Sequence, residues 1–141
     1  MEKEKVLVSA CLLGLNCKYD GENNRNEKVL EYIKDKEVIP VCPEIFGGLQ
    51  TPRIPSEIVG DKVLNREKID VTKEYQKGAE ETLYLAKLFN VKKALLKESS
   101  PSCGSNTIYD GTFSKNKKEG MGITAKLLKE NGIEIISEKE L

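Results

Sequence analysis

The chain has 141 residues, which is enough for one domain with a substantial hydrophobic core. Its 23 basic and 23 acidic residues cancel, so the basic excess typical of a nucleic-acid-binding protein is absent and we expect no nucleic-acid partner. No apolar run approaches the ~20 residues of a membrane span, and the charged residues 1–5 do not resemble a signal peptide, so we expect a cytoplasmic protein without a membrane partner.

The first part of the chain predicts two strands and one helix. Residues 5–10 are an apolar run typical of a buried strand, which ends at Cys11. Asn26 is a favourable N-cap for a short helix with one apolar face. Residues 37–41 predict a second strand, and Pro40 within it indicates an edge position, because proline cannot donate to a strand ladder.

The rest of the chain predicts a long loop followed by alternating strands and helices. Residues 43–70 show no clear periodicity and are expected to be an irregular, functional loop. Residues 72–90 predict the longest helix, 92–96 a third strand, 124–130 a short helix and 133–136 a final strand. The apolar face of the long helix is expected to contain Tyr75, Ala79, Leu83, Ala86 and Phe89.

Strands that alternate with helices predict an α/β fold. We therefore expect residues 1–141 to form a single domain with a mostly parallel sheet flanked by helices.

Histidine is absent from the chain, and this absence restricts the chemistry. It removes the commonest general base and the commonest zinc ligand, together with every nucleophilic pair that depends on histidine. The four cysteines are therefore the most informative residues. In a cytosolic chain they are not expected to form lasting disulfides.

Three of the cysteines follow predicted strands. Cys11, Cys42 and Cys103 come after the strands at 5–10, 37–41 and 92–96, and the carboxyl ends of parallel strands share one edge, where open α/β sheets bind ligands. We therefore expect the three thiols to converge in one crevice. The turn-forming and helix-starting residues around them are expected to lower their pKa values and favour the metal-binding thiolate.

The kind of metal group stays open on this reasoning. Three thiolates leave a zinc ion or a 4Fe–4S cubane short of one ligand, and an open position on a metal is where chemistry occurs. Cys17, in a polar turn-rich stretch, is either the fourth ligand or an incidental loop residue.

A set of short motifs, in order, resembles the bacterial thiouracil desulfurase family over residues 6–138. The match includes Val8-Ser-Ala-Cys11-Leu-Leu-Gly, Val41-Cys-Pro-Glu44, Pro52-Arg53-x-Pro55, Lys97-Glu-x-Ser-Pro-Ser-Cys103-Gly and Ile108-Tyr-Asp-Gly-Thr-Phe113. The resemblance implies a 4Fe–4S cluster held by Cys11, Cys42 and Cys103, whose fourth iron binds the sulfur of a small thiolated substrate. It also implies proton-handling roles for Glu44 and Ser100.

These roles form a consistent mechanism for the removal of sulfur by hydrolysis, without net electron transfer. An open iron polarises the C=S bond as a Lewis acid. Glu44 is then the natural general base for an attacking water, and Ser100 relays a proton or orients the substrate. Arg53 is expected either to bind the substrate or to form a surface ion pair.

Two other classes of protein remain as alternatives. A structural or regulatory zinc domain would use all four cysteines, and a thiol–disulfide oxidoreductase would use two. Both normally contain Cys-x-x-Cys pairs, which this chain lacks. The sequence does not identify the physiological substrate or the oligomeric state.

Overall fold

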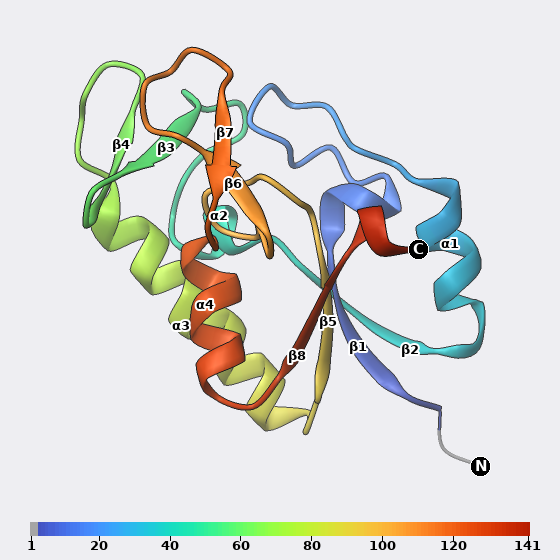
Figure 1. Cartoon of the computed structure of the whole chain (residues 1–141). Helices are drawn as coiled ribbons and strands as arrows, with labels where there is room; N and C mark the ends of the chain where they lie inside the picture. The colour runs from blue at the N-terminus through green and yellow to red at the C-terminus, as the bar shows by residue number, and fades with distance from the viewer. Residues whose placement is uncertain (1–2) are drawn as a thin grey trace.

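Four apolar segments pair as a parallel sheet in the computed structural model, which describes residues 3–141. The sheet has the order β2-β1-β5-β8, and all of its pairings are parallel (Figure 1). This confirms the predicted α/β fold. Its strands are β1 (Lys5–Ser9), β2 (Glu37–Val41), β5 (Lys93–Leu96) and β8 (Glu134–Ser137).

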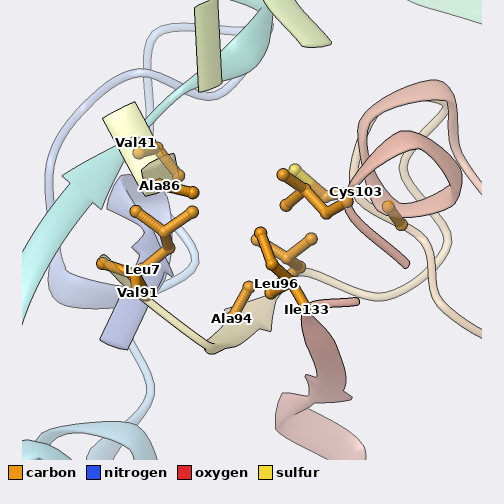
Figure 2. Close-up of a cluster of buried hydrophobic side chains, with 10 residues drawn as sticks. Leu7, Val41, Ala86, Val91, Ala94, Leu96, Cys103 and Ile133 are labelled. Atoms are coloured by element: carbon orange, nitrogen blue, oxygen red, sulfur yellow. The ribbon is translucent and has the colours of Figure 1, made fainter. Parts of the chain in front are cut away.

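Helices cover both faces of this sheet, which is why its strands are apolar on both sides. On one face lie α3 (Thr72–Leu88) and α4 (Ile123–Glu130), and their side chains pack against Leu7, Ala94 and Leu96 of the sheet (Figure 2). On the other face lies α1 (Glu27–Tyr32), whose Val29 packs with Val6, Val8 and Leu95.

Two local predictions, the N-cap Asn26 and the edge position of Pro40, are confirmed at the level of single residues. The side chain of Asn26 caps α1 by accepting hydrogen bonds from two backbone amides. β2 is an edge strand, so Pro40 has only one neighbouring strand to pair with.

The helix α3 ends at Leu88, and Asn90 follows in the left-handed conformation with φ of 56°. Phe89 therefore lies outside the helix and is 43% exposed, so its predicted place on the apolar face of the helix is wrong.

The prediction of an irregular segment over residues 43–70 is wrong in two places. The segment begins with a short helix, α2 (Pro43–Phe46), and it contains an antiparallel hairpin of β3 (Ser56–Val59) and β4 (Lys62–Asn65). A second short hairpin, β6 (Thr107–Tyr109) with β7 (Lys117–Glu119), was also not predicted. Figure 1 shows both hairpins at the end of the molecule toward which the carboxyl ends of β1 and β5 point.

The helix α2 packs backbone to backbone against α3 at a pair of glycines. A Cβ on Gly47 would lie 1.9 Å from the carbonyl oxygen of Glu74, and a Cβ on Gly78 would lie 1.9 Å from that of Pro43. Only glycine allows this approach. The contact places α2, which follows Cys42 and contains Glu44, directly against the longest helix.

We predict that Gly78→Ala destabilises the protein although alanine is the better helix former. The new methyl group overpacks against Pro43, so we expect the free energy of unfolding to fall by about 1–3 kcal/mol. Urea unfolding measures the change, with Gln76→Ala on the exposed side of α3 as the control. A gain in stability for Gly78→Ala, as its helix propensity alone would give, would contradict this role for the contact.

Candidate active site

A cavity of about 370 Å³ lies at the carboxyl edge of the parallel sheet. Its walls come from the loops after β1, β2 and β5 and from the two hairpins. The predicted convergence of the cysteines is therefore found, and it extends to the fourth cysteine. The four thiols on the cavity wall, all free, belong to Cys11, Cys17, Cys42 and Cys103.

Each of the three predicted ligands is held by a different local structure. Cys11 lies in a turn of 3₁₀ helix, residues 10–13, directly after β1. Cys42 follows β2 and is the N-cap residue of α2. Cys103 lies in the loop that connects β5 to β6, and it is only 4% exposed. All three positions therefore follow strands of the same parallel sheet.

The expectation that all three thiols have lowered pKa values is correct for one of them. The pKa of Cys42 falls to about 7, chiefly because the Cys17 thiol donates a hydrogen bond to its sulfur, and the Ile45 amide of α2 helps. Burial raises the pKa of Cys11, and a hydrogen bond from Asn24, 3.5 Å from the sulfur, only partly opposes it. Burial also raises the pKa of Cys103, to about 12.

Cys17 lies beside Cys42 inside the cavity wall. Its side chain is buried, and its carbonyl oxygen is 3.9 Å from the Cys42 sulfur and 2.9 Å from a guanidinium nitrogen of Arg53. The pKa of Cys17 is raised, first by the hydrogen bond to Cys42 and then by burial. Cys17 is therefore part of the site, and its backbone also holds Arg53 in place.

The loop after β5 is fixed by the buried carboxylate of Glu98. One carboxylate oxygen accepts hydrogen bonds from the backbone amides of Ser99, Ser105, Asn106 and Thr107, at 2.9–3.2 Å. Burial alone would raise the pKa of Glu98, but the hydrogen bonds from Asn106 and Thr107 lower it to about 2.

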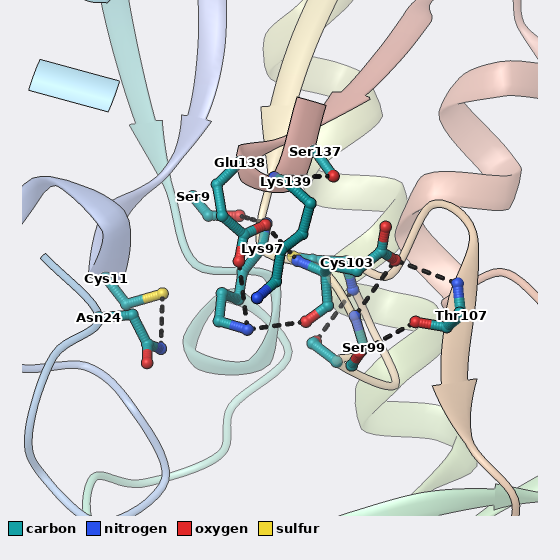
Figure 3. Close-up of polar contacts among 12 residues, drawn as sticks. Ser9, Cys11, Asn24, Lys97, Ser99, Cys103, Thr107, Ser137, Glu138 and Lys139 are labelled. Atoms are coloured by element: carbon teal, nitrogen blue, oxygen red, sulfur yellow. Dashed lines mark hydrogen bonds and ion pairs between the residues drawn. The ribbon is translucent and has the colours of Figure 1, made fainter. Parts of the chain in front are cut away.

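Beside this loop, Glu138 accepts a hydrogen bond from the Glu98 amide at 2.8 Å and pairs with Lys97 at 3.3 Å (Figure 3). Lys97 also lines the cavity. Its amide donates to the hydroxyl of Ser9, at the end of β1, at 2.9 Å, so the loop after β5 is joined to the central strand of the sheet.

Glu44 and Arg53 form an ion pair at the cavity wall. The Arg53 Nε and the Glu44 Oε1 are 2.8 Å apart, and the two side chains are only 9% and 14% exposed. The ion pair expected for Arg53 therefore exists, but it is buried. A role for Arg53 in substrate binding stays a prediction.

Ser100 does not contact Glu44 directly; Ser102 lies between them. The Ser102 hydroxyl is 2.8 Å from that of Ser100 and donates to the Glu44 Oε2 at 3.1 Å. Sequence reasoning missed Ser102, although its place between Ser100 and Cys103 in the motif was a usable signal. It also missed Tyr75, a cavity residue whose hydroxyl pKa is raised, first by burial and then by Glu44.

The arrangement of the thiols bears on the kind of metal group that they could hold. Within residues 3–141, no three cysteine or acidic side chains are grouped so as to hold one metal ion. A tetrahedral zinc site would place its sulfur ligands about 3.8 Å apart, given Zn–S bonds of about 2.3 Å. A cubane binds each cysteine through a different iron atom, so its ligands are more widely spaced. Three thiols on separate loops around one cavity are a donor set of the kind that such a cluster uses.

The fold and the cavity define an α/β protein with a cysteine-lined site at the carboxyl edge of its parallel sheet. The sequence profile of the 2-thiouracil desulfurase family matches residues 6–140, and the chain belongs to this family.

Two relatives support this assignment. The chain is 44% identical over 146 aligned residues to the uncharacterized protein YbbK of Bacillus subtilis (strain 168), covering 96% of this chain and 97% of that protein. It is also similar to the solved structure of the 4Fe–4S-dependent thiouracil desulfidase TudS, with a TM-score of 0.91 and 43% identity over 99% of this chain and 93% of that one.

In the part of the chain that the structure describes, no helix combines the length and the apolar character that a membrane span requires.

We predict that Glu98→Gln lowers the free energy of unfolding at pH 7 by about 3 kcal/mol, because four amides lose a charged acceptor. The folded pKa lies below the ordinary value of 4.5, so the stability from the charged form is fully present above pH 4.5 and is lost as the pH falls through about 2. Urea unfolding at several pH values measures the difference in the free energy of unfolding between wild type and Glu98→Gln, with exposed Glu80→Gln as the control. A free-energy difference that stays constant down to pH 2 would contradict the lowered pKa of Glu98.

Proposed function

We propose that this chain, a single domain over residues 1–141, removes sulfur from a small thiocarbonyl compound of the thiouracil type by hydrolysis, without net electron transfer. We propose that Cys11, Cys42 and Cys103 hold a 4Fe–4S cluster in the cavity. The observation that carries the proposal is the meeting of these thiols, from three separate strand ends, with the Glu44 carboxylate at one cavity. The 4Fe–4S dependence of the similar protein TudS supports it.

The proposed reaction replaces a C=S bond by a C=O bond. Water supplies the oxygen that bonds to carbon, and the sulfur leaves with the C–S bonding electrons as hydrosulfide, so neither an oxidant nor a reductant is needed. When bound, the cluster supplies a Lewis-acidic iron with an open coordination position that polarises the thiocarbonyl sulfur.

Glu44 is the residue best placed to take the proton from the attacking water. Arg53 donates a hydrogen bond to one of its carboxylate oxygens and Ser102 to the other. The carboxylate is therefore oriented before the substrate enters, which is how a general base is made effective. The chain contains no histidine, so no histidine competes with Glu44 for the role of general base.

The cavity suits a small substrate. Its volume of about 370 Å³ is at the lower end of ligand pockets, and its lining is partly apolar, with Tyr19, Tyr109 and Phe113 among the walls. We propose a small thiolated molecule as the partner, in the cytoplasm. The zero net charge also supports the expectation that nucleic acid is not a partner.

The first test concerns the cluster and its ligands. Protein purified without oxygen is expected to be brown, with iron and acid-labile sulfide in near-equal amounts. Cys11→Ala, Cys42→Ala and Cys103→Ala should each lose the cluster, because each removes a thiolate bond. Cys17→Ala, the matched control from the same cavity, should keep both cluster and activity.

Two results would contradict this assignment. Colourless protein with stoichiometric zinc would favour the zinc domain. Loss of the cluster from Cys17→Ala would indicate a site with four ligands, which leaves no open iron.

The second test separates chemistry from cluster binding. Glu44→Gln keeps the size of the side chain but cannot take a proton, so we expect full iron content and a fall in turnover of ~10²–10⁴-fold. The measurement is hydrosulfide release from 2-thiouracil, with iron determined in parallel. Near-normal turnover at full iron content would remove Glu44 from the mechanism, and loss of iron would make it a structural residue or a ligand.

A further inference from the structure

The hydroxyl of Ser100 has only one direction in which to donate its proton. Its oxygen accepts hydrogen bonds from the backbone amides of Ser102, at 3.1 Å, and Cys103, at 3.0 Å. A hydroxyl has two lone pairs and one proton, so both acceptor positions are occupied. The remaining contact, to the Ser102 oxygen at 2.8 Å, must therefore be a hydrogen bond that Ser100 donates.

This fixes the direction of the next hydrogen bond as well. Ser102 accepts from Ser100, so its own proton points to one of two acceptors, the Glu44 Oε2 at 3.1 Å or the Cys103 sulfur at 3.6 Å. The carboxylate is the stronger acceptor, because hydrogen bonds to charged oxygen are about twice as strong as neutral ones and sulfur accepts weakly. Ser100 thus donates its hydrogen bond to Ser102, and Ser102 donates its own to Glu44.

The position of Ser102 is fixed by burial and by backbone contacts. Its side chain is 2% exposed, so water does not replace its hydroxyl without an opening of the loop. Behind it, the N-terminal amides of α4 hold its carbonyl oxygen, since Thr124 and Ala125 donate to it at 2.9 and 3.1 Å. A Cβ on Gly122 would lie 2.5 Å from the Ser102 carbonyl carbon, so the packing leaves little freedom to move.

We infer that Ser102 is a positioning residue for the desulfurisation, which acts by orienting the Glu44 carboxylate and by directing the Ser100 proton toward it. The inference rests on the proposed function, in which Glu44 is the base. Arg53 fixes one oxygen of Glu44 and Ser102 fixes the other, so the plane of the carboxylate is defined by two contacts from different segments. Without Ser102, the Oε2 atom loses this donor, and the carboxylate is held only from its other side by Arg53 and by its contact with the Tyr75 hydroxyl.

The experiment compares Ser102→Ala, Ser102→Thr and the control Ser105→Ala. Ser105 is in the same loop, but its hydroxyl contacts Glu98 and not Glu44. The readouts are iron content, visible absorption of the cluster, and kcat and KM for hydrosulfide release from 2-thiouracil. We expect Ser102→Ala to keep its iron and its KM and to lose about 10²-fold in kcat, as for a misplaced catalytic group. Ser102→Thr, which keeps the hydroxyl, should restore most of the loss.

A double-mutant cycle tests whether Ser102 acts through Glu44. In the Glu44→Gln background, Ser102→Ala should cause no further loss of kcat, because the group that it orients is already gone. Equal losses in both backgrounds, or loss of iron from Ser102→Ala, would overturn the inference and assign Ser102 to the structure of the loop.

The same measurements separate this inference from the proposed function. Full turnover of Ser102→Ala beside an inactive Glu44→Gln would contradict the inference alone. Wild-type protein with full iron that releases no hydrosulfide would contradict the proposed function and the inference with it.

Discussion

The hydrogen bonds to Glu98 are the interaction on which the rest of the site depends. The loop from Ser99 to Thr107 carries three serines and one cysteine of the cavity, and its backbone would otherwise leave several amides without partners. One buried carboxylate oxygen accepts four of them and so sets the curvature of the loop. The charge of Glu98 is balanced by these amide dipoles rather than by a cation, because the nearby Lys97 pairs with Glu138.

The surrounding elements hold the other parts of the site at fixed distances from this loop. The first amides of α4 donate to loop carbonyl oxygens, which caps the helix and ties the loop to the core at the same time. On the opposite wall, the contact between Gly47 and Gly78 seats α2, and with it Glu44, on α3. The cavity is therefore preorganised by backbone contacts, and its functional side chains need little rearrangement to act.

The parallel sheet could be predicted from the sequence because its two central strands, β1 and β5, are buried on both faces, so their apolar runs are continuous. The hairpin of β3 and β4 could not, because three of its four buried positions are polar, namely Ser56, Glu57 and Asn65. Glu57 accepts the amides of Gly111 and Phe113, and Asn65 accepts those of Glu67 and Ile69. For the site, the motifs indicated the cysteines, Glu44 and Ser100. The link through Ser102 depends on how the helix α2 meets a loop 58 residues further along the chain, which no local pattern contains.

The cysteines that line the cavity come from three different crossovers of the sheet, and this has a consequence for how such a site is inherited. A metal-binding loop with two closely spaced cysteines is a short module that moves between proteins as one piece. Here Cys11 and Cys103 are separated by most of the chain and meet only through the strand pairing of β1 with β5. The site therefore cannot be copied as a peptide into another scaffold, and recombination within the chain would divide it. The site and the whole fold must pass together from ancestor to descendant.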